Sequence, residues 1–136
     1  MPFPIDLKYI EQAEQELGVT LPEIFKAKMM KENGGEVGTD KEGWTLFPFL
    51  DKSDNKRISR TNNDIVLETR NARQWNKFPK DAVAIGENGS GDYLLLQPID
   101  KSKNQISEIP YSWWHETGEI HKVGESITDL LAPDNM

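Results

Sequence analysis

The chain has 136 residues, a formal net charge of -7 and no cysteine, so a disulfide framework, a thiolate zinc site and a cysteine nucleophile are excluded. Hydrophobic residues make up 36% of the sequence and charged residues 29%, a balance that predicts one folded domain over residues 1–136. The acidic surplus disfavours nucleic acid as a partner, and it indicates either a solubility feature or attraction to a basic protein.

Two helices are predicted near the start of the chain from apolar residues at helical spacing. The first is expected over Leu7–Leu17, with Asp6 as its N-cap and Gly18 at its end. The second is expected to have Pro22 at its first position and to end at the Asn-Gly-Gly run of residues 33–35. Its basic run consists of Lys26, Lys28 and Lys31. We expect a solvated helix face there, and a true basic patch is the alternative.

The middle of the chain is less regular. Residues 44–49 are too apolar for a loop but include Pro48, which predicts an edge strand or an irregular segment under the core. A polar connection over residues 51–57 follows, and then a helix over residues 64–75. The residues available to cap that helix are Thr61, Asn62 and Asn63.

The second half of the sequence is rich in strand signals. Short apolar runs over residues 82–85 and 93–96 flank the glycine-rich stretch 86–92, which predicts two antiparallel strands joined by a turn with positive φ. A further strand is expected over residues 106–115, and the chain is expected to return through residues 120–123.

A short helix is predicted to close the domain. Ser126 and Asp129 form a capping pair ahead of Leu130 and Leu131. Helices come first in this order and strands come later, which is typical of an α+β domain. The predicted fold is therefore a single α+β domain with N-terminal helices packed on a mainly antiparallel sheet and a short C-terminal helix.

No catalytic or cofactor signature is present. The glycine-rich stretch lacks the spacing of a dinucleotide or phosphate loop, and Ser90 lacks the flanking glycines of a nucleophile elbow. The two histidines, His115 and His121, flank a Thr-Gly turn, but the sequence defines no further metal ligand beside them. We therefore expect a protein that is not an enzyme and has no catalytic, cofactor-binding or metal-binding residues.

Several separated segments occur in a fixed order. They are residues 16–22 (Glu-Leu-Gly-Val-Thr-Leu-Pro), the Asn-Gly-Gly of 33–35, residues 84–96 and the Ser-Ile-Thr-Asp-Leu-Leu of 126–131. With these segments in this order, the chain resembles the Smi/Knr-type members of the SUKH superfamily. The resemblance implies a compact α+β fold and no catalytic residues. It also implies that many bacterial members are immunity proteins that neutralise toxins, often nucleases.

Strand alternation suggests where a partner binds. In the strand over residues 106–115, Trp113 shares one face with other apolar residues and Trp114 lies on the opposite, more polar face. An aromatic anchor ringed by carboxylates suits protein recognition. The predicted partner-binding residues are Trp114, Glu108, Ser112, Glu116 and Glu119. The alternative is that a helix or loop covers Trp114.

Two functions remain open from the sequence. The first is an immunity protein that binds a basic, nuclease-type toxin, and the second is a scaffold or regulatory module of the Knr type. The sequence has no basic segment followed by an apolar run near its start, and no stretch long and apolar enough to cross a bilayer. A cytoplasmic protein with no membrane partner is therefore expected.

Overall fold

The computed structural model describes residues 3–39, 42–100 and 104–131. Within them, six strands form one sheet in the order β1 to β6, with every neighbouring pair antiparallel. The strands are β1 (Gly35–Gly38), β2 (Gly43–Leu46), β3 (Val83–Glu87), β4 (Tyr93–Leu96), β5 (Tyr111–Trp113) and β6 (Ile120–Lys122). The helices are α1 (Leu7–Leu17), α2 (Glu23–Lys31), α3 (Asn55–Arg60), α4 (Ile65–Ala72) and α5 (Thr128–Leu131). The predicted α+β class is confirmed.

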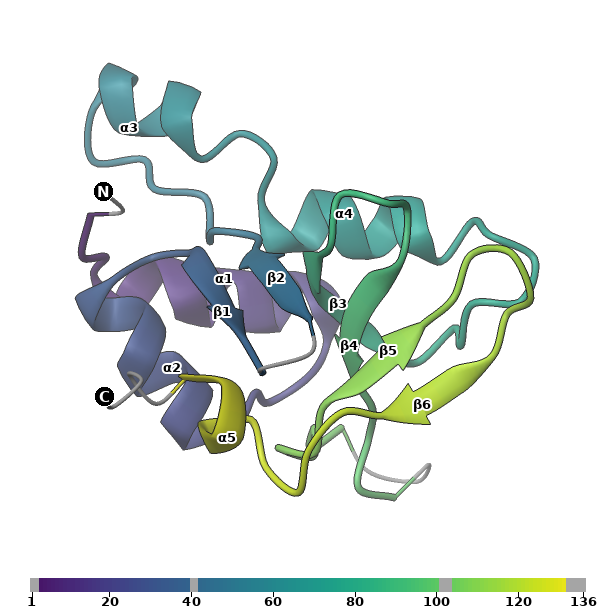
Figure 1. Cartoon of the computed structure of the whole chain (residues 1–136). Helices are drawn as coiled ribbons and strands as arrows, with labels where there is room; N and C mark the ends of the chain where they lie inside the picture. Colours follow the sequence, from purple (N-terminus) through teal and green to yellow (C-terminus); the bar gives the residue numbers. More distant parts are fainter. Residues whose placement is uncertain (1–2, 40–41, 101–103, 132–136) are drawn as a thin grey trace.

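The helices cover the sheet unevenly. Figure 1 shows α1 and α4 behind the sheet, while α5 lies against α2 and β1. Helix α4 is fixed to β3 by the buried hydroxyl of Thr69, which donates to the Ala84 carbonyl (3.2 Å) and accepts from the Ala84 amide (3.1 Å). The β5–β6 hairpin lies at one side of the molecule, away from α3 (Figure 1).

Capping residues set the helix ends. The Asp6 carboxylate accepts from the Lys8 amide (3.0 Å), and Gly18 ends α1 at a φ of 69°, as predicted. The N-cap of α4 differs from its prediction. Asp64 caps the helix, and the predicted candidates Thr61, Asn62 and Asn63 do not. It also ends at Ala72, before the predicted end at 75.

Of the two predictions for residues 44–49, the edge strand is wrong, whereas residues 47–49 form the irregular segment under the core. β2 lies inside the sheet, because β1 and β3 pair with its two sides, and Pro48 falls beyond its last residue. The edge strands are β1 and β6, and β1 has two glycines in four residues and therefore little strand signal. The polar connection expected over residues 51–57 likewise contains the start of α3.

Two further expectations are corrected. The long strand expected over residues 106–115 is only the three-residue β5, because Pro110 has no amide to donate to a ladder. The prediction of a solvated lysine face on α2 is wrong for Lys26, which is buried and forms ion pairs of 3.1 Å with Glu14 and Glu23.

The C-terminal helix agrees with its prediction, since the Asp129 carboxylate accepts from the Glu125 and Ser126 amides.

Candidate partner-binding surface

The two adjacent tryptophans of β5 point to opposite faces of the sheet. Trp113 is 1% exposed and Trp114 is 43% exposed. Trp113 pairs with Tyr93 on β4, and both rings lie on the face that carries the aromatic core. Trp114 follows the last residue of β5 and is open to solvent. The alternation therefore places Trp114 outward, and no helix or loop covers it within the described residues.

A tight turn holds Trp114 in place. The Trp114 amide donates to the Glu119 carbonyl (2.9 Å), and the Gly118 amide donates to the Trp114 carbonyl (2.7 Å). Gly118 has a φ of 78°, which favours glycine. The Trp114 ring packs on the His121 ring of β6 at a centroid distance of 4.2 Å and an interplanar angle of 36°. We call the exposed residues Trp114, Glu116, Glu119 and His121 the hairpin surface.

The structure separates the five predicted partner-binding residues. Trp114, Glu116 and Glu119 lie together on the hairpin surface, and Glu119 Oε1 is 3.0 Å from His121 Nε2. Glu108 lies before β5, at the other end of the strand, and its carboxylate accepts from the Ser126 hydroxyl. The outward position predicted for Ser112 is wrong, because this residue is only 5% exposed inside the sheet.

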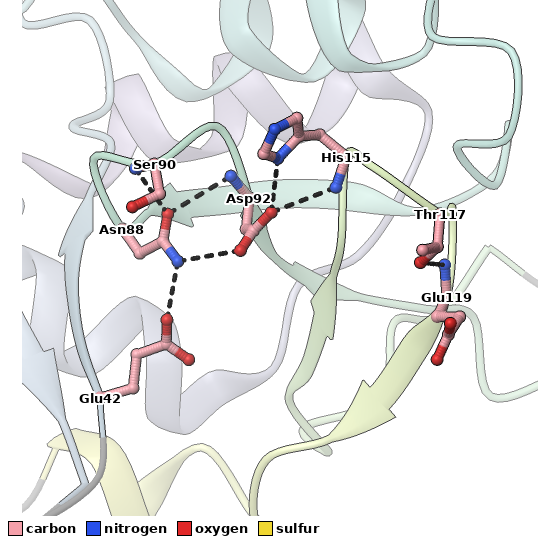
Figure 2. Close-up of polar contacts among 7 residues, drawn as sticks. All are labelled: Glu42, Asn88, Ser90, Asp92, His115, Thr117 and Glu119. Carbon is pink, nitrogen blue, oxygen red and sulfur yellow. Dashed lines mark hydrogen bonds and ion pairs between the residues drawn. The ribbon is translucent and has the colours of Figure 1, made fainter.

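A hydrogen-bond network fixes the base of the hairpin surface (Figure 2). The Asn88 side chain donates to Glu42 (2.7 Å) and to Asp92 (3.1 Å), and its oxygen accepts from the Ser90 amide (2.9 Å). Asp92 Oδ1 in turn accepts from the His115 amide (3.1 Å) and lies 2.7 Å from His115 Nδ1. The network joins the β1–β2, β3–β4 and β5–β6 connections, so it restricts the motion of the residue next to Trp114.

The histidines do not face each other. His115 contacts Asp92, whereas His121 contacts Glu119 and the Trp114 ring. No group of three or more His, Asp or Glu side chains in the described ranges could hold a metal ion. Each imidazole instead has a carboxylate partner of its own, which orients its ring.

Asp92 makes the network sensitive to acid. Burial alone would raise the pKa of this carboxyl, but hydrogen bonds from His115 and Asn88 lower it below its ordinary value of 3.8. A depressed pKa stabilises the folded state above the unfolded pKa, and this stabilisation is lost as the pH falls through the folded value.

We expect Asp92→Asn to lower the free energy of unfolding by about 1–2 kcal/mol at pH 7, because the charge-assisted hydrogen bonds are lost. The difference from the parent protein should shrink as the pH falls through the lowered pKa of Asp92. Urea unfolding between pH 7 and pH 2 measures this difference, with Glu36→Gln as an exposed control that keeps the parental profile. A difference that does not change with pH would contradict the assignment.

Sequence reasoning missed part of this site. No local sequence signal predicts the contact of His121 with Trp114, because this contact depends on the pairing of Ser112 with His121 across β5 and β6. The network around Asn88 had a usable signal in the sequence. Asparagine and aspartate around a glycine-rich turn commonly bond to nearby backbone amides, as Asn88 does here.

The model of the SMI1 / KNR4 family (SUKH-1) matches residues 4–132, nearly the whole chain. No curated protein matches the chain. Among the described residues, no helix has the length and apolar character needed to cross a membrane.

Proposed function

Because the chain belongs to the SMI1 / KNR4 family (SUKH-1), we propose that it is a non-catalytic, cytoplasmic immunity protein that binds and neutralises a basic, nuclease-type toxin. The observation that carries this proposal is the hairpin surface. It combines an exposed tryptophan, held by a stacked imidazole, with the carboxylates of Glu116 and Glu119.

The chemistry of this surface fits a protein partner. Tryptophan is enriched among the residues that dominate binding energy, and a side chain held rigidly before binding loses less entropy on association. The turn hydrogen bonds and the His121 ring hold Trp114 in this way. Nuclease surfaces that bind phosphates are basic, so an acidic protein is attracted to them and competes with nucleic acid.

The exposed carboxylates should act mainly on the rate of association. We expect Glu116→Lys with Glu119→Lys to lower the association rate constant about tenfold at low salt and to flatten its salt dependence, because long-range attraction is lost. The dissociation rate should change less. Stopped-flow or surface-based kinetics at several salt concentrations measure both rates.

The matched control is Glu11→Lys with Glu16→Lys on α1. It makes the same change in net charge at exposed positions away from the hairpin. If the control slows association as much as the hairpin variant, only net charge matters and the hairpin surface does not face the partner.

A further inference from the structure

Two arginines converge on one aromatic ring at the side of the molecule that carries α3. The Arg57 guanidinium lies 4.6 Å from the centroid of the Phe3 ring, and the Arg60 guanidinium lies 5.2 Å from it. The two arginines are three residues apart on α3, so they share one helical face. Phe3 therefore holds both positive groups in defined positions.

Neither guanidinium has a negative partner among the described residues. The Arg57 side chain makes a long hydrogen bond to the Ser53 hydroxyl (3.4 Å), and the Arg60 guanidinium lies over the Phe3 ring. Two like charges at this spacing repel each other, and most of their hydrogen-bond donors remain unused. In a chain with a net charge of -7, uncompensated arginines on one aromatic ring indicate a site for an external anion.

The arginines line a hollow of about 390 Å³ between α3 and the start of the sheet. Asn63 and Thr45 also line it and are exposed, so they add polar groups beside the arginines. The hollow contains one carboxylate, that of the buried Asp51, whose Oδ1 already accepts from the Ser53 amide.

We propose that this hollow binds carboxylate side chains of an acidic peptide segment on a protein partner. A guanidinium matches the planar, two-oxygen geometry of a carboxylate. The nearby charge of Asp51 and the net negative charge of the chain oppose a phosphate dianion more strongly than a single carboxylate. The site lies on the opposite side of the molecule from the β5–β6 turn (Figure 1) and does not depend on the toxin-binding proposal.

The test uses a short capped peptide with two adjacent glutamates, titrated into the whole chain and followed by NMR at constant ionic strength. We expect saturable shifts of the Arg57 and Arg60 Nε–Hε signals, with a Kd on the order of 1 mM. The same peptide with glutamines in place of the glutamates should produce no saturable shift. Arg57→Gln with Arg60→Gln should weaken binding at least about tenfold.

Two variants separate site geometry from overall charge. Phe3→Leu keeps both arginines but removes the ring, so it should weaken peptide binding while a thermal melt shows a folded protein. Lys8→Gln removes a cation from the ring of Tyr9 elsewhere on the surface and should leave the Kd unchanged. Linear shifts without saturation, equal binding of the glutamine peptide, or tighter binding of inorganic phosphate than of the acidic peptide would each overturn the proposal.

Discussion

Replacing Trp114 with alanine should weaken binding of the basic partner by about 2 kcal/mol or more, which is roughly 30-fold in Kd. The ring is exposed in the free protein and would be buried in the complex, so its loss should appear mainly as faster dissociation. The free energy of unfolding should fall by about 1 kcal/mol, because the ring is partly exposed and loses its contact with the His121 ring.

Trp75→Ala is the matched control for this prediction. Trp75 is 48% exposed and packs against Trp113 at a centroid distance of 5.9 Å, on the other face of the sheet. Its truncation should leave the affinity unchanged. If Trp114→Ala is folded and binds like the parent protein, the partner contacts another surface, and the segment over residues 36–60 is the next one to test.

Replacing the neighbouring Trp113 with alanine should instead lower the free energy of unfolding strongly. The buried ring contacts Phe78 at 5.4 Å and Tyr93 at 5.9 Å, and its Nε1 donates to the Lys77 carbonyl (3.2 Å). Truncation of a buried tryptophan costs about 3–5 kcal/mol, a large share of the stability of a small domain. Urea unfolding followed by circular dichroism measures the loss.

A conservative variant separates packing from hydrogen bonding at the same position. Trp113→Phe keeps an aromatic ring in the cluster and removes the Nε1 donor, so its loss of stability should be clearly smaller than that of the alanine variant. A loss below about 1 kcal/mol for Trp113→Ala would contradict the assignment of this ring to the core.

Local signals in the sequence predicted much of the fold. Helix α1 and its caps, the β3–β4 pair and the C-terminal helix follow from spacing, glycine and capping residues, which act over a few residues. The β3–β4 turn has Gly89 at a φ of 84° and Gly91 at 100°, as its composition predicts. Strand β1 and the burial of Lys26 could not be predicted this way, because both depend on partners distant in sequence.

Part of the hairpin surface could also be predicted from local sequence signals. Alternation within one strand separates Trp113 from Trp114, since neighbouring residues point to opposite faces. The burial of Ser112 depends on what covers the second face of the sheet, and the position of Glu108 depends on a break in the strand at Pro110. Both require the tertiary structure.

The proposed immunity function can be tested by titrating the purified chain with the carboxy-terminal, nuclease-type domain of a secreted protein encoded beside its gene. We expect a stable one-to-one complex and loss of the nuclease activity in proportion to the complex formed. Calorimetry together with a nuclease assay on the same samples measures both quantities. A neighbouring nuclease domain that does not bind, or that binds and stays fully active, would contradict the immunity function and favour a regulatory module of the Knr type.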